Sequence, residues 1–120
     1  MEPTLTDEDW VKINEMAKTF MQNLREKFDP LSLHWEVPIL SKNQNGSVIS
    51  GNIDLLIETH GGYWIFDHKS EESENMQKTF NHYLPQLRGY AQALSEGMKL
   101  KVKGLAIHWA CMGAISSVIK

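Results

Sequence analysis

The chain has 120 residues, 42% of them hydrophobic and 22% charged, which is the composition of an ordinary globular domain. Its single cysteine, Cys111, excludes an internal disulfide and a zinc site of the CxxC type. The formal net charge of −3 argues against a free-standing DNA-binding protein, because neutralising phosphates requires a positive surface. No apolar run is long enough to span a bilayer and no basic-then-apolar leader opens the chain, so we expect one cytoplasmic domain over residues 1–120.

The first predicted element is a helix. Thr6 and Asp9 form a capping-box pattern, and Asp29-Pro30 marks the end of the helix. Between them, apolar residues recur at steps of three and four and form one stripe: Trp10, Ile13, Ala17, Phe20, Leu24 and Phe28. This stripe predicts a helix that packs on the core. A first strand over His34–Leu40 and a turn at Asn45-Gly46 follow.

Two apolar segments then predict an antiparallel β-hairpin. Val48–Glu58 and Tyr63–His68 are rich in β-branched and aromatic residues, and they flank a Gly-containing turn at 59–62. Each segment carries an aspartate, Asp54 and Asp67. A loop of two or of four residues would place the two aspartates directly opposite each other, with Cβ atoms about 4.5–5.5 Å apart. A loop of three would shift the register and separate them.

Lys69 lies two residues beyond Asp67 and therefore projects from the same face of the strand, whereas His68 points away. Burying carboxylates without partners is costly, so this cluster needs a reason. One interpretation is a Mg²⁺ site for hydrolysis of a phosphodiester, with Lys69 orienting water or stabilising phosphate charge. The alternative is a hairpin in which Asp67 and Lys69 only form an ion pair at a solvent-facing edge.

The remaining pattern completes an α/β fold. We expect a polar, acidic loop at residues 70–75 and a second helix that begins near Leu84, with Pro85 in its first turn, and ends at Gly97. Two strands follow, Val102–Trp109 and Ala114–Ile119, and His108 in the first of them is predicted to be a core residue. The predicted architecture is a mixed central sheet that starts with an antiparallel meander and is flanked by helices.

Three motifs in order resemble the PD-(D/E)XK nuclease superfamily: G-x-I-D at residues 51–54, D-x-K at 67–69 and Q-x-x-x-Y at 86–90. Within the superfamily, the chain from about His34 to Ile119 looks like the RecB-type nuclease domain of bacterial helicase–exonuclease subunits. The resemblance implies a restriction-endonuclease-like core. His34–Pro38 then corresponds to the family's first core strand, which carries a glutamate, here Glu36.

The resemblance also implies roles for individual residues. Asp54 and Asp67 would bind Mg²⁺ or Mn²⁺ together with the backbone carbonyl of His68. Lys69 would be the catalytic lysine and Glu36 an auxiliary acidic residue. Two further residues, Gln86 and Tyr90, would lie beside the site or contact DNA; without the family match, a core tyrosine and a glutamine in the first helical turn would explain them as well.

The activity implied by the resemblance is that of a metal-dependent DNA nuclease, the exonuclease module of an ATP-dependent helicase–nuclease in DNA repair, with DNA delivered by the helicase domain or subunit. One departure matters. RecB-type members usually supply a histidine ligand from a helix before the first strand, and the first predicted helix here contains none. The chain is then either a C-terminal fragment that lacks this helix or a catalytically inactive module that serves as a scaffold or guides single-stranded DNA.

Overall fold

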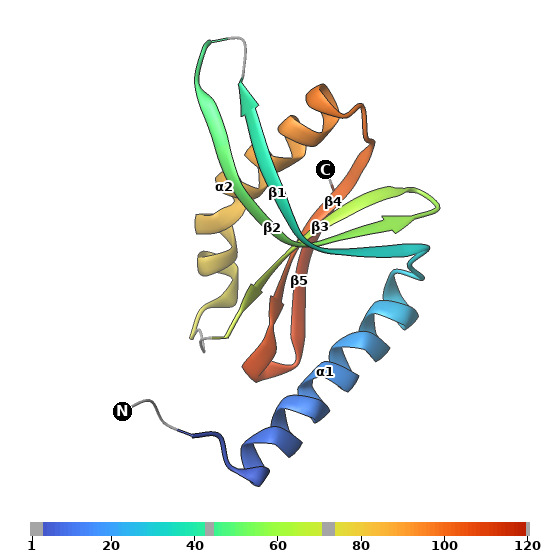
Figure 1. Cartoon of the computed structure of the whole chain (residues 1–120), viewed down its shortest axis with the longest axis vertical. Coiled ribbons are helices and arrows are strands. Elements are labelled where there is room, and N and C mark those ends of the chain that lie inside the picture. The colour runs from blue at the N-terminus through green and yellow to red at the C-terminus, as the bar shows by residue number, and fades with distance from the viewer. Residues whose placement is uncertain (1–3, 43–44, 71–73, 120) are drawn as a thin grey trace.

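The computed structural model of the chain describes residues 4–42, 45–70 and 74–119 and has an α/β architecture (Figure 1). A helix precedes the sheet, a second helix interrupts it, and the elements in chain order are α1 (Asp7–Lys27), β1 (Ser32–Lys42), β2 (Val48–Thr59), β3 (Gly62–Lys69), α2 (Met76–Gly97), β4 (Val102–Trp109), the 3₁₀ helix η1 (Ala110–Met112) and β5 (Ala114–Ile119). The strand order is β1-β2-β3-β4-β5; β3 and β4 are parallel and every other neighbouring pair is antiparallel. The predicted mixed sheet with an initial antiparallel meander is confirmed.

The two helices cover opposite faces of the sheet. On one face, Leu87 and Leu94 of α2 belong to a core that includes Ile65 of β3. On the other, Phe20 and Leu24 of α1 pack with Phe66 of β3. Because Ile65 and Phe66 are consecutive residues of one strand, their side chains point to opposite sides, and each side has its own helix. In the part of the chain that the structure describes, no helix is both long and apolar enough to cross a membrane.

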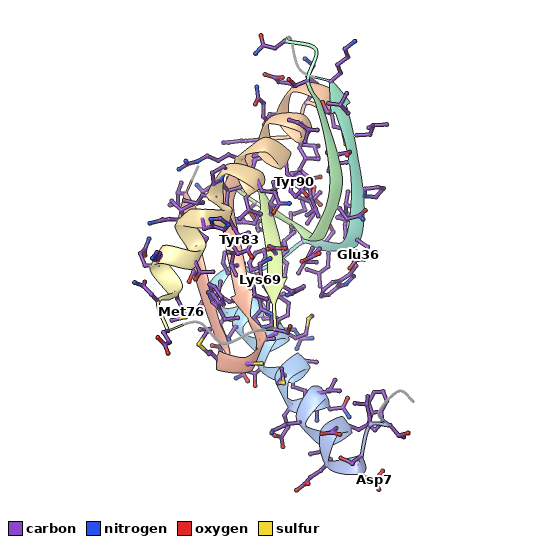
Figure 2. All side chains as sticks on the ribbon, turned by 90° about the vertical axis from the view of Figure 1, so that its left-hand side faces the viewer. Asp7, Glu36, Lys69, Met76, Tyr83 and Tyr90 are labelled. Carbon is purple, nitrogen blue, oxygen red and sulfur yellow. The ribbon has the colours of Figure 1, made fainter. Side chains whose placement is uncertain are left out.

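Helix α1 packs on the sheet through its second half only. Its capping box forms as predicted, with Asp9 N donating to Thr6 Oγ1 and Thr6 N donating to Asp9 Oδ2. However, Trp10 and Ile13 are exposed, and the first turns project away from the sheet (Figures 1 and 2). The prediction that the whole stripe packs on the core was wrong, because periodicity shows that one helix face is apolar but does not show what that face contacts.

Helix α2 begins eight residues earlier than predicted, at Met76 rather than Leu84. The side chain of Asn75 caps it by accepting a hydrogen bond of 3.0 Å from Lys78 N. Pro85 therefore lies inside the helix, at an exposed position, where its missing N–H removes one intrahelical bond. The predicted acidic loop before this helix lies partly outside the described residues, at 71–73.

The strands β1 and β2 are irregular at one rung of their ladder. Trp35 pairs with Leu55 and Val37 pairs with Ile53, but no pair forms between Glu36 and Asp54. Glu36 has φ 53°, a left-handed conformation that non-glycine residues rarely adopt. Figure 2 shows Glu36 where β1 bends.

The bend changes which face the side chains point to. Before it, Leu33 packs in the core under α1; after it, Val37 packs in the core under α2, although both are odd-numbered. In β2, Leu55 faces α1 and Ile53 faces α2 in the same way. Regular alternation would keep each pair on one face, so both strands turn over together at the rung of Glu36 and Asp54.

Candidate active site

A two-residue turn sets the register of the site. The last pair of the β2–β3 ladder is Thr59 with Gly62, which leaves His60-Gly61 as the loop. Thr59 Oγ1 donates a hydrogen bond of 2.6 Å to the Gly62 carbonyl, and Gly62 has φ 137°. A Cβ at Gly62 would lie 2.8 Å from the Lys101 carbonyl oxygen, so only glycine suits the position. Of the two loop lengths that align the aspartates, the structure has the shorter.

This register brings Asp54 to the rung of Asp67. The ladder ends at Leu55 and Phe66, one residue before both aspartates. Beyond it the Asp54 side chain takes the place of a strand partner, because Asp54 Oδ2 accepts a hydrogen bond of 2.8 Å from His68 N. The half-buried Asp54 carboxylate is thus anchored to the backbone of the strand that carries Asp67.

Asp67 and Lys69 form the charged centre of the site. Lys69 Nζ lies 2.9 Å from Asp67 Oδ2, as an ion pair. The same oxygen is buried and accepts no well-directed hydrogen bond from any of the described residues. Burial, together with a hydrogen bond to the Asp54 carboxyl, raises the pKa of Asp67 to about 6, against the opposing effect of Lys69. Burial also lowers the pKa of Lys69, but Asp67 outweighs it, and the net pKa of Lys69 lies above its ordinary value. The two carboxylates and the ammonium therefore meet, as the hairpin predicts.

Tyr83 of α2 completes the surroundings of Lys69 and was missed in the sequence. Lys69 Nζ lies 3.8 Å from the centroid of the Tyr83 ring, a cation–π contact, and Figure 2 shows the two residues together. Its position offered a signal: Tyr83 lies three residues before Gln86 and seven before Tyr90, which places all three on one side of a helix. The signal was lost because the helix was expected to begin after Tyr83.

Gln86 and Tyr90 contact each other, as their spacing predicts. Gln86 Nε2 donates a hydrogen bond of 3.2 Å to Tyr90 Oη, and Tyr90 is buried. The Tyr90 hydroxyl lies against Gly51 of β2, so closely that a Cβ there would collide with it. Among the described residues, no hydrogen bond joins either side chain to Asp54, Asp67 or Lys69. A role beside the site or on DNA stays a prediction for both.

The His68 side chain points to the opposite face, as predicted. Its Nδ1 lies 2.9 Å from Nδ1 of His108, whose ring stacks on Phe20 with centroids 3.9 Å apart. Burial and the neighbouring His68 lower the pKa of His108 to about 4, so His108 is the partnered core residue that was expected. Burial lowers the pKa of His68 as well, against the charges of Asp54 and Glu36. Glu36 is exposed at the irregular rung, close enough to influence His68.

The donor set is compatible with a hard cation but is small. Asp54 and Asp67 provide oxygen ligands, and the buried Asp67 Oδ2 has no hydrogen-bond donor. Over residues 4–42, 45–70 and 74–119, no group of three or more His, Cys, Asp or Glu side chains is arranged to hold a metal ion. Mg²⁺ commonly binds through one or two carboxylates and keeps several waters, so two such ligands are sufficient for it.

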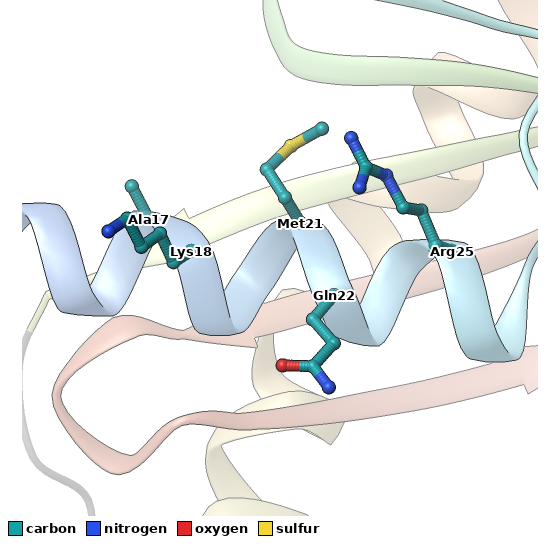
Figure 3. Close-up of a pocket in the computed structure, with 5 residues that line it drawn as sticks. All are labelled: Ala17, Lys18, Met21, Gln22 and Arg25. Carbon is teal, nitrogen blue, oxygen red and sulfur yellow. The ribbon is translucent and has the colours of Figure 1, made fainter.

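The largest hollow of the described surface is not at this site. About 640 Å³ lie along α1, lined by Ala17, Lys18, Met21, Gln22 and Arg25. Figure 3 shows that all five side chains belong to one helix. Such a shallow surface along a single helix brings no reactive groups together, so we assign the chemistry to Asp54, Asp67 and Lys69.

Comparison with known proteins agrees with this geometry. No curated protein matches the chain significantly, whereas 11 chains of solved structures do. One is the crystal structure of SSO0001, which is 18% identical, has a TM-score of 0.51 and aligns over 89% of this chain and 50% of that one. This chain spans half the length of SSO0001, and at that identity the likeness shows the fold alone. The family profile of the PD-(D/E)XK nuclease superfamily matches residues 4–114, nearly the whole chain, so the protein belongs to the PD-(D/E)XK nuclease superfamily.

Proposed function

We propose that the chain is the nuclease module of a helicase–nuclease of RecB type and hydrolyses DNA with Mg²⁺ or Mn²⁺. Membership of the superfamily indicates a nuclease that acts on DNA with a divalent metal ion. The RecB-type assignment, the exonuclease activity and the identity of the ion are the further steps of the proposal. They are supported by the G-x-I-D, D-x-K and Q-x-x-x-Y motifs in the RecB order.

The observation that carries the proposal is the state of the Asp67 carboxyl. It is placed beside a second carboxylate, one of its oxygens is buried without a hydrogen-bond donor, and its pKa is raised to about 6. A site with no ligand to bind would have little reason to keep two acidic groups in so costly a position.

The residues divide the work as follows. Asp54 and Asp67 hold the cation, with the backbone carbonyl of His68 as a further oxygen ligand. A bound divalent ion supplies a polarised phosphoryl oxygen and a water of lowered pKa. Lys69, held between Asp67 and the Tyr83 ring, donates hydrogen bonds to the attacking water or to the phosphate. Glu36 adds negative charge at the next strand, and Gln86 and Tyr90 support DNA beside the site.

The net charge of −3 supports delivery of the DNA by a neighbouring domain. We therefore place the chain beside a helicase domain or subunit, as part of a larger protein. This arrangement would also supply a histidine ligand, which α1 lacks. A histidine on α1 would in any case approach from the face of His68 and not from the face of Tyr83.

A second function keeps the ancestry without the catalysis. The small ligand set of the described residues favours a scaffold, or a guide for single-stranded DNA within the same complex. The two functions differ in turnover, and one variant series separates them.

The test compares Lys69→Ala, Asp67→Asn and Lys12→Ala with the unaltered protein on end-labelled linear DNA. Lys12 is the control because it is an exposed lysine on the projecting half of α1. We expect cleavage only with Mg²⁺ or Mn²⁺, and a loss of about 100-fold or more in turnover for Lys69→Ala, the size typical of removing one stabilising donor. Asp67→Asn should also lose Mn²⁺ affinity in calorimetry, and Lys12→Ala should behave as the unaltered protein.

A Lys69→Ala protein that cleaves at the normal rate would refute the catalytic assignment. A natural full-length protein that binds DNA and shows no metal-dependent turnover would instead establish the scaffold. Circular dichroism of each variant separates lost chemistry from lost folding.

A further inference from the structure

A second hollow lies on the other side of the reactive strand. It has a volume of about 460 Å³ and opens between α1 and the ends of β1 and β3. Its lining includes three aromatic or imidazole side chains and a lysine: Phe20, Trp35, His68 and Lys69. Nothing in the proposed hydrolysis uses the rings of this hollow.

These rings are held in fixed orientations. His68 Nδ1 and His108 Nδ1 are 2.9 Å apart, and the edge of the Phe20 ring meets His68 with centroids 5.1 Å apart. The Trp35 ring is nearly parallel to the His68 ring, with an interplanar angle of 18° and centroids 5.9 Å apart. Flat surfaces of this kind are thus ready before any ligand arrives.

Trp35 differs from the other rings in its exposure. It is 52% exposed although it lies inside a strand, whereas the neighbouring Leu55 and Phe66 on its rung are fully buried. Trp35 also directly precedes Glu36, where β1 turns over, so the bend leaves this indole on the α1 side of the sheet. A large π-face is therefore presented to solvent at the mouth of the hollow.

The hollow is continuous with the candidate active site. Lys69 lines it, and the ammonium of the same residue contacts Asp67. Asp67 and His68 are consecutive, so the carboxylates and the hollow lie on the two sides of a single strand. The chain of one nucleotide links a phosphate to a base, and a strand passing over the end of β3 can place one on each side.

The charges favour a base over a phosphate at this mouth. Glu36 and Asp54 both act on His68 electrostatically, so the surroundings of the Trp35 ring are negative. Lys69 is the cation that lines the hollow, at the end nearest Asp67. An uncharged planar group would therefore occupy the ring side, with the anionic backbone towards Lys69.

We propose that this hollow receives an unpaired nucleobase of the DNA substrate, stacked on Trp35, while an adjoining phosphate lies at Asp67 and Lys69. The proposal rests on the proposed nuclease function and adds a preference for single-stranded DNA or frayed ends. A base inside a duplex is already stacked on both faces, so it cannot enter without being unpaired. Stacking on an aromatic side chain accepts any base, so the subsite selects for strandedness and not for sequence.

The experiment measures binding of a 12-nucleotide thymidine oligonucleotide and of a blunt duplex by fluorescence anisotropy, in EDTA so that no cleavage occurs. Trp35→Ala should weaken binding of the single strand about 5- to 100-fold, the usual effect of removing one stacking ring. Trp35→Phe keeps a ring and should stay within about threefold. Trp10→Ala is the matched control, because Trp10 is 53% exposed but lies on the projecting half of α1. Duplex affinity should not change in any variant.

Four outcomes would overturn the proposal: normal single-strand affinity in Trp35→Ala, an equal loss in Trp35→Phe or Trp10→Ala, an equal loss for the duplex, or no single-strand binding by the unaltered protein. Thermal unfolding of Trp35→Ala must match that of Trp35→Phe for the comparison to count. Because the assay needs neither metal nor turnover, a failure of the nuclease function in the Lys69→Ala test leaves its result unaffected.

Discussion

The ammonium of Lys69 is held by two different kinds of partner. Asp67 attracts it through an ion pair of 2.9 Å, and the face of Tyr83 attracts it from 3.8 Å. The ion pair alone would draw the lysine onto the carboxylate that is proposed to bind the metal. The ring provides a second, uncharged attraction that persists when Asp67 is occupied by a cation. We therefore expect Tyr83 to set the position of Lys69 during turnover.

This expectation can be tested with two substitutions at Tyr83. Tyr83→Leu keeps an apolar side chain without the π-face and should lower kcat about 3- to 30-fold, the range of a partly desolvated cation–π contact, with KM little changed. Tyr83→Phe keeps the face and should retain activity within about threefold. Steady-state kinetics with linear DNA give both constants. Equal losses in the two variants would assign the effect to the hydroxyl, and no loss in Tyr83→Leu would remove Tyr83 from the site.

At the level of elements, the seating of α2 on the sheet depends on one small residue. The Tyr90 hydroxyl occupies the space that a side chain at Gly51 would need. Tyr90 is 8% exposed and belongs to the core under α2. This contact lies one turn beyond Gln86 and two beyond Tyr83, so it also fixes the height at which α2 presents its polar face to β3.

A double-mutant cycle measures this contact. Gly51→Ala should destabilise the protein by about 1–3 kcal/mol, since the added methyl group overpacks the interface. Tyr90→Phe removes the atom that collides, so Gly51→Ala should cost clearly less when it is made in the Tyr90→Phe protein. Urea unfolding of the four proteins gives the coupling free energy. Strictly additive effects would show that Gly51 and Tyr90 do not constrain each other.

At the scale of the whole molecule, the hairpin was the most predictable part and the helices the least. The site followed from a local rule, because the turn at 60–61 determines which residues of β2 and β3 face each other. The strands Val102–Trp109 and Ala114–Ile119 were predicted with the bounds that the structure has. Pro85 misplaced the start of α2, because its effect on a helix depends on whether its side of the helix is exposed.

Other features have no local signature. The left-handed conformation of Glu36 arises where two bent strands turn over together, and a single strand pattern cannot show it. The contact between Tyr83 and Lys69 depends on where α2 crosses the sheet. The exposed half of α1, with Trp10 and Ile13, shows the same limit: an amphipathic pattern predicts a helix but not its partner.

Acid stability combines opposing contributions from the two faces of β3. The pKa of His108 is lowered from 6.5 to about 4, so the unfolded chain binds a proton here at higher pH than the folded chain does. Stability from His108 is complete above about pH 6.5 and is lost as the pH falls towards 4, by at most about 3 kcal/mol. The pKa of Asp67 is raised from 3.8 to about 6, so protonation there favours the folded state over the window from pH 6 to 4. His68, whose pKa is lowered, adds to the loss.

The two contributions can be separated by comparing free energies of unfolding in urea at pH 7 and pH 5, with EDTA present. Asp67→Asn removes the compensating group, so this variant should lose more stability on acidification than the unaltered protein. His108→Asn removes one of the two opposing imidazoles and should lose less. The order of the three slopes is the result to check, because it depends on the sign of each pKa shift and not on its size. If all three proteins lose the same free energy between these pH values, then neither face of β3 holds its charged groups as tightly as the pKa values of Asp67 and His108 require.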